Sequence, residues 1–230
     1  MQKMITLLLI ACNITLSGCT SVPFYADSEK NTYAFSNISD YDTGFEIGNA
    51  IFEIQNNPAL DKPAILVNQE PIQLSSIAIQ KVYYENNVQT DFREQIYKMI
   101  VKKAVEQQAD HLGIAIDDDA VEDSINQQIS TMETLQPEFF QGFLSGLRLT
   151  KEEYIEKQKT ATYHTLQRDS LWQSVKSENE DEILFLTKQK DISYQDAIQS
   201  FYDEYTDKLI QQAKIQYLDT SIYEFMKDYH

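Results

Sequence analysis

Few side chains in this sequence have the types and spacing that enzymatic or metal chemistry requires. The three histidines, His111, His164 and His230, are scattered along the chain, and no Cys, His or carboxylate spacing around them resembles a zinc or catalytic set. His111 stands near the end of a predicted helix, where the helix dipole stabilises a cation. The sequence contains neither a phosphate-binding glycine loop nor a Gly-x-Ser-x-Gly elbow. We therefore expect no catalytic residues, no metal and no cofactor.

Asp117, Asp118 and Asp119 form a run of three carboxylates before another predicted helix. Such a run could bind a cation, but it lacks the central glycine and the distal bidentate Glu of a calcium-binding loop. Carboxylates at a helix N-terminus accept free backbone N–H groups and suit the helix dipole. We interpret Asp117 as a helix cap.

The residues that predict a covalent modification lie at the N-terminus. An apolar run from Met4 to Cys12 is followed by Leu16-Ser17-Gly18-Cys19. The run is too short to span a bilayer but fits the core of a secretory signal peptide. Its last four residues resemble a bacterial lipobox, which implies cleavage after Gly18 and diacylglyceryl transfer to Cys19. An ordinary secretory leader with an incidental cysteine is the alternative.

A signal peptide over residues 1–18 places the mature chain outside the cytoplasm, anchored by lipid to a bacterial membrane in the cell envelope. Cleavage also removes Cys12, so the mature chain keeps one cysteine and cannot form an intrachain disulfide. The net charge of −17 argues against a nucleic-acid partner and against electrostatic adhesion to anionic lipid. We expect the acyl chains to hold the protein to the membrane.

The 230 residues have room for one full domain and a tether. Residues 19–63 are expected to form a tether and an irregular segment, within which 44–55 could be a short helix or strand. Ile65 to Val67 should be a strand, followed by a turn at Asn68-Gln69. Two-residue hairpins need positive φ at both central residues, so Gln69 in the place of glycine predicts a strained or different turn.

The stretch from Asp91 to Ile129 predicts two helices joined by a corner at Gly113. Apolar residues recur at three- and four-residue steps in the first helix, and Asp91 with Glu94 has the form of a capping box. Glycine after the last apolar residue suits the positive φ that ends a helix.

Three more helices are predicted beyond this pair. Pro137 begins a helix with an aromatic face, which Gly142 and Gly146 should weaken. Thr150 and Glu153 form a capping box for a long helix, and Ser193 opens the last long one. The alternation in 214–219 predicts a strand that could pair with 65–67 and close the domain, and 220–230 is expected to be a short tail.

These elements, in this order, resemble the SurA N-terminal domain and the PrsA-type foldases. The matching residues are Val67 to Ile72, Ile96, Met99, Ile100, Ala109, Gly113, Ile114, Asp117, Val121, Thr150 to Tyr154 and Ala213 to Ile215. The resemblance covers about residues 64–219 and implies a mainly helical chaperone domain closed by a small β element from its N- and C-terminal strands.

The chain departs from this family at three places. Gln69 replaces the turn glycine, and Arg148 stands where the family has a glycine before its capping Thr. In the foldases a glycine-rich parvulin domain separates the Tyr-bearing helix from the closing helix. Here only Val175 to Ile192 lies in that gap, without glycine or histidine. Prolyl isomerase activity is therefore not expected.

The resemblance implies a lipid-anchored chaperone that binds unfolded or nascent secreted polypeptides through apolar helix faces. Exposed apolar patches commonly mark partner sites. The side chains expected to form this surface, unless they are core, come from two helices: Phe139, Phe140, Phe143, Leu144, Leu147, Tyr163 and Trp172. The alternative is an envelope adaptor that binds one dedicated folded partner.

Overall fold

The computed structural model describes residues 40–85 and 91–229. The predicted signal peptide, the predicted lipidation site Cys19, the part of the predicted tether up to residue 39 and His230 lie outside the described residues. Within them the chain forms nine helices and one antiparallel three-stranded sheet. The predicted class, mainly helical with a small β element, is confirmed.

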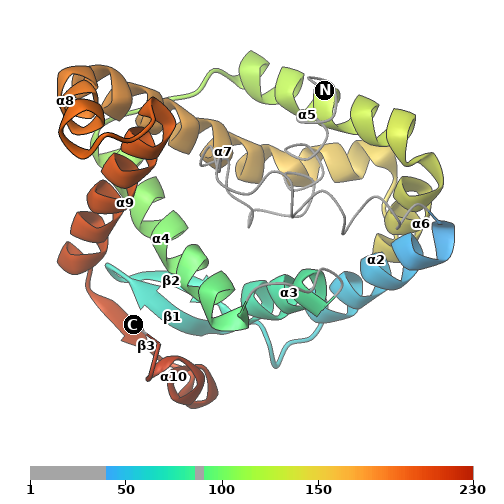
Figure 1. The fold of residues 1–230 in the computed structure, drawn as a ribbon. Helices are drawn as coiled ribbons and strands as arrows, with labels where there is room; N and C mark the ends of the chain where they lie inside the picture. The colour runs from blue at the N-terminus through green and yellow to red at the C-terminus, as the bar shows by residue number, and fades with distance from the viewer. Residues whose placement is uncertain (1–39, 86–90, 230) are drawn as a thin grey trace.

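Six helices follow one another around a ring (Figure 1). In the order in which they contact, they are α2 (Tyr41–Gln55), α3 (Leu74–Glu85), α4 (Phe92–His111), α7 (Lys151–Glu178), α5 (Asp118–Leu135) and α6 (Pro137–Leu147), which packs on α2. Helices α3 and α7 lie on opposite sides, and no contact comparable to those around the ring joins them. The ring therefore has an inward side and an outward side.

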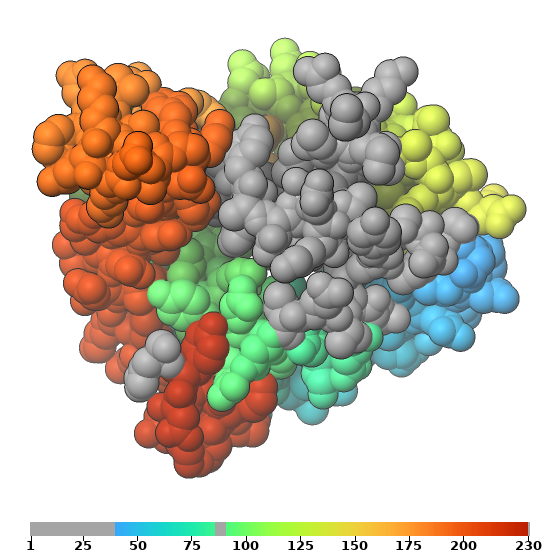
Figure 2. All heavy atoms as spheres, in the orientation of Figure 1, coloured from blue at the N-terminus to red at the C-terminus, as the bar shows by residue number. Residues whose placement is uncertain are grey.

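Two further helices pack where α4 meets α7. They are α8 (Glu180–Lys190) and α9 (Tyr194–Gln212), which contact each other and the ends of α7 and α4. Figure 2 shows their orange and red atoms as one wall of the molecule, opposite the place where the blue atoms of α2 meet the yellow-green atoms of α6.

The sheet joins the two ends of the described chain. Its order is β2 (Glu70–Gln73), β1 (Pro63–Val67), β3 (Ile215–Tyr217), and α10 (Thr220–Met226) follows β3. Ile65 lies opposite Tyr217 and Val67 opposite Ile215 in an antiparallel pair. The predicted pairing of the C-terminal strand with residues 65–67 is confirmed, and the expected tail begins with the short helix α10.

The turn between β1 and β2 keeps the backbone geometry that usually requires glycine. Asn68 has φ +49° and Gln69 has φ +76°, so both central residues are in the positive-φ region. The Asn68 side chain accepts from the Lys214 backbone N–H at 2.7 Å and donates to Gln107 Oε1 at 2.9 Å. Gln107 in turn donates to the Val67 carbonyl at 2.8 Å. Contacts from β3 and α4 thus hold a turn that the sequence predicted to be strained.

The predicted helix starts are confirmed at Asp91, Asp117, Thr150 and Ser193, each of which caps its helix through its side chain. Both hydrogen bonds of the Thr150–Glu153 capping box are formed. At Asp91 the predicted box is replaced, because Asp91 accepts from the Arg93 N–H and Glu94 pairs with Lys98 instead. Gly113 ends its corner with φ +69°.

Helix α2 decides the prediction left open for residues 44–55, which are helical, and corrects the expectation that this part of the chain belongs to a tether and irregular segment. It packs on α6 through glycines spaced four apart on each helix, Gly44 and Gly48 against Gly142 and Gly146. A Cβ atom at Gly48 would lie 2.3 Å from the Phe143 carbonyl oxygen, and one at Gly142 would lie 2.0 Å from that of Tyr41. The glycines that were expected only to weaken α6 bring the two backbones into contact, so α2 belongs to the folded domain.

Candidate functional site

The aromatic residues of α6 lie in the core. Phe139, Phe140, Phe143 and Leu147 are at most 7% exposed, and Leu144 is partly buried. Helix α2 covers them with Ile47 and Ile51, and Tyr154 of α7 packs edge-on against Phe140 and Phe143. These residues therefore do not form an exposed client-binding surface. They are covered by α2, a segment for which the sequence left helix or strand open.

Trp172 is also buried, at 2% exposure, but in a different core. Its ring lies 4.7 Å from that of Tyr202 and 5.6 Å from that of Tyr205, both on α9. Tyr163 is partly buried beside the α2–α6 core. The seven predicted residues therefore do not form one surface.

Large apolar side chains that are exposed lie elsewhere, in small groups. Phe185 is the most exposed at 60% and stands beside Leu184 on α8. Others lie at the N-terminal end of α2 and around β3 and α10: Tyr41, Phe45, Leu218, Tyr223 and Phe225. Tyr41 and Phe45 stack on each other, and Phe225 packs against Phe92. Scattered exposure of this kind is ordinary for a soluble surface.

Buried polar side chains give a clearer pattern, because most of them come from the faces of three ring helices. The buried polar residues are Gln80 on α3, Lys102 and Glu106 on α4, and Gln158, Thr162, Gln167 and Arg168 on α7. Burying amides and charges away from water costs free energy unless they are hydrogen bonded. A concentration of such groups therefore needs an explanation.

The inward side of α7 is identified by what its two ends contact. Tyr154, near the start, packs on α6, and Arg168, near the end, bonds to Glu106 of α4. Helices α6 and α4 lie at different places on the ring. The face of α7 that carries both contacts therefore points toward the side that the ring encloses. Gln158 and Thr162 lie on that face between them, at four-residue steps from Tyr154.

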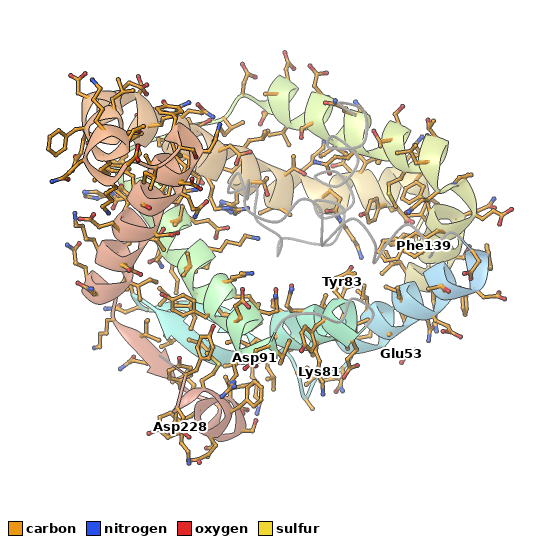
Figure 3. All side chains as sticks on the ribbon, viewed as in Figure 1. Glu53, Lys81, Tyr83, Asp91, Phe139 and Asp228 are labelled. Carbon is orange, nitrogen blue, oxygen red and sulfur yellow. The ribbon has the colours of Figure 1, made fainter. Side chains whose placement is uncertain are left out.

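The same reasoning applies to α4. Gln95 bonds to Gln80 of α3, and Glu106 bonds to Arg168 of α7. Lys102 lies on the face between them, one turn before Glu106 and two turns after Gln95. Figure 3 shows Tyr83 of α3 directed into the ring from the opposite side. We call Gln80, Tyr83, Lys102, Glu106, Gln158, Thr162 and Arg168 the inner polar face.

An ion pair joins α4 to α7 at one end of this face. Arg168 Nη1 donates to Glu106 Oε1 at 2.5 Å, and Arg168 Nη2 donates to Thr165 Oγ1 at 3.0 Å. Burial lowers the pKa of the Arg168 guanidinium, and the nearby Glu106 carboxylate opposes that shift. Lys103 adds a second, longer contact to Glu106 at 3.5 Å. Removing either partner would leave a buried charge, so the pair fixes the angle of the two helices.

Gln167 supports the same junction from the outer side of the pair. Its amide donates to Asp110 Oδ1 at 2.7 Å and to the Ile114 carbonyl at 2.9 Å, and His164 Nδ1 lies 3.2 Å from its Oε1. His164 thus contacts a structural glutamine, and His111 lies exposed in the last turn of α4. Neither histidine stands in a set of groups arranged for acid–base chemistry.

Two donors on the inner polar face lack a partner in the described part of the chain. Gln158 Nε2 and Arg168 Nε are buried and have no acceptor within hydrogen-bonding range there, although their residues are only 4% and 2% exposed. An orphaned buried donor costs about 1–3 kcal/mol. A donor kept at that cost can serve a ligand that carries an acceptor.

Sequence reasoning missed this face. Its signal was available in the long helix after Thr150, where Gln158 and Thr162 follow Tyr154 at four-residue steps, at positions that a core-facing helix would fill with apolar residues. Polar residues at core positions of a helix predict either a paired network or a binding surface.

No family model, curated protein or solved structure matches the chain. Across residues 40–85 and 91–229, no three His, Cys, Asp or Glu side chains gather closely enough to hold a metal ion. In the same residues no helix is both long and apolar enough to cross a membrane.

Proposed function

We propose that the chain is a lipid-anchored extracytoplasmic protein that binds a polypeptide partner without chemical turnover. The signal peptide and Cys19 supply the location and the anchor in this proposal. The binding role is supported by the inner polar face. On this face the helices of the ring direct amides, a hydroxyl and ionic groups toward the enclosed side. A polypeptide main chain, with alternating acceptors and donors, is the common biological ligand for such groups.

The likeness to the SurA N-terminal domain supports the same role. The elements that carry it follow one another here as helices α3 to α7, and the closing strand β3 pairs with β1. Helix α8 takes the place of the parvulin domain, so the proposal includes no prolyl isomerisation.

Between the two forms of this function, the geometry favours an adaptor for one dedicated partner. A chaperone that holds many unfolded clients needs a broad apolar surface, and the aromatic residues of α6 that were expected to provide it are buried. Polar groups that must each find a partner are selective, because an ill-fitting ligand leaves them unpaired.

Affinity capture from cross-linked envelopes tests the adaptor. We expect one polypeptide to be retained in stoichiometric amount, and its retention to persist when unfolded competitor is added in excess. Many weakly retained proteins that the competitor displaces would contradict the adaptor and favour the chaperone.

A chaperone is the second candidate function, because the inner polar face could bind the main chain of a polypeptide regardless of that polypeptide's side chains. Its measurement is the aggregation of an unfolded secretory protein with increasing amounts of the chain. Suppression at equimolar ratio would support it, and no effect at several-fold molar excess would exclude it.

A further inference from the structure

We propose that the inner polar face binds an extended, uncharged segment of the partner by hydrogen bonds to its main chain, and that the Gln158 amide is a principal donor to that segment. This inference rests on the proposed polypeptide-binding function and assigns it a site and a class of ligand.

The first step concerns the position of Gln158. It lies on α7 between Tyr154, which contacts α6, and Arg168, which contacts α4. The side chain is 4% exposed, and its Nε2 group has no partner among the described residues. Leu or Met would fill the same space without that cost. The amide is therefore better explained by a ligand than by packing.

The second step concerns charge. The ionic groups on this face are Lys102, Glu106 and Arg168, and Asp169 adjoins Arg168 closely enough to influence its pKa. Lys103 adds a third cation beside Glu106, and Glu70, which it also contacts, adds a third carboxylate. The three cations and three carboxylates balance, whereas the whole chain carries a net charge of −17. A neutral face within an acidic protein suits a segment without net charge, since a charged ligand would find no counter-ion.

The third step concerns the kind of contact. The remaining groups of the face are an amide on α3, a phenol at Tyr83, and an amide and a hydroxyl on α7. Amides and hydroxyls match the carbonyl and N–H groups of an extended chain, which cannot satisfy them internally as a helix does. Recognition of this kind requires a segment that is extended and uncharged, which a dedicated partner can present.

The test compares Gln158→Met with Gln173→Met in the full-length chain. Both changes remove a glutamine amide from α7, but Gln173 is exposed. The probes are two fluorescent, uncharged peptides with unrelated sequences and a carboxamidomethylated, permanently unfolded protein, and the readouts are equilibrium binding and the melting temperature. Thr162→Val, which keeps the shape of a buried side chain, is a second variant of the same face.

We expect Gln158→Met to weaken binding of both peptides by a similar factor, about three- to tenfold, because one hydrogen bond is lost in each complex. Its melting temperature should stay the same or rise, since an orphaned buried amide has been removed. Gln173→Met should bind as the original chain does.

Three results would overturn the inference. Unchanged binding with Gln158→Met and Thr162→Val would place the polypeptide elsewhere while leaving the proposed function intact. A lower melting temperature for Gln158→Met with unchanged affinity would make Gln158 a structural residue. No binding of any probe by the unaltered chain would remove the inference, whereas the proposed adaptor would still be decided by the capture of its one dedicated partner.

Discussion

Replacing Gly48 by Ala tests the contact that closes the ring. On helix propensity alone, Ala in place of a mid-helix Gly should stabilise α2 by about 1 kcal/mol. Packing predicts the opposite, that the substitution lowers the free energy of unfolding. A Cβ atom at this position would lie 2.3 Å from the Phe143 carbonyl oxygen and 3.0 Å from the Leu147 backbone nitrogen, where ordinary contacts begin at 3.4 Å.

The obstruction is backbone, so no side-chain rotation can relieve it, and α2 must move away from α6 by about 1 Å. Overpacking of this kind costs about 1–3 kcal/mol. After the gain in helix propensity, we expect a net loss of up to about 2 kcal/mol, equivalent to a fall of up to roughly 8 °C in melting temperature for a domain of this size. Gly146→Ala should behave alike, and the double variant should cost less than the sum because one displacement relieves both.

Urea unfolding followed by circular dichroism measures these changes. Glu46→Ala on α2 and Gln141→Ala on α6 are the matched controls, because both positions are exposed, and each should stay within about 0.5 kcal/mol of the original chain. A Gly48→Ala variant that is more stable than the original chain would refute the close helix pair and, with it, the closed ring.

Three further predictions concern single interactions. Glu106→Leu or Arg168→Met alone should each destabilise the fold by about 3–5 kcal/mol, because each leaves one buried charge unpaired, whereas the double variant should cost much less than the sum. A double-mutant cycle in urea measures this, and additive costs would contradict the buried pair. Hydrogen bonds from Ser221 and Lys62 lower the pKa of Asp219 to about 2 from its usual 3.8. A depressed carboxyl pKa contributes stability above about pH 4 that is lost as the pH falls toward 2, so Asp219→Asn should flatten this part of the acid unfolding curve, and an unchanged curve would count against the cap of α10. Cys19→Ser should abolish incorporation of labelled fatty acid and release the chain from the membrane fraction; continued labelling would disprove the lipidation site.

Much of the local structure could be predicted because local chemistry determines it. The caps at Asp117 and Thr150 and the corner at Gly113 depend on residues within one helical turn, and all three are where the sequence places them. The pairing of β1 with β3 spans most of the chain, yet a short apolar run near one end and an alternating pattern near the other indicated it.

The α2–α6 contact was missed because its signal is the same spacing at two distant places. Each glycine pair, taken alone, indicates only a weak helix. The four-residue interval indicates close packing of two helices only when both helices carry it. That omission led directly to the wrong expectation for Phe139, Phe140 and Phe143, since aromatic residues on a helix without a known neighbour are naturally taken as exposed. The inner polar face was missed for a related reason, because only the ring shows that faces of α4 and α7 look toward one enclosed side.

Hydrogen–deuterium exchange of the chain, alone and in complex with its captured polypeptide, tests most directly whether the ring's enclosed side is the binding site. The account predicts added protection in peptides from α3, α4 and the middle of α7, around Gln80, Lys102 and Gln158. Protection confined to the exposed apolar residues of α8 or α10, with none on those three helices, would contradict it.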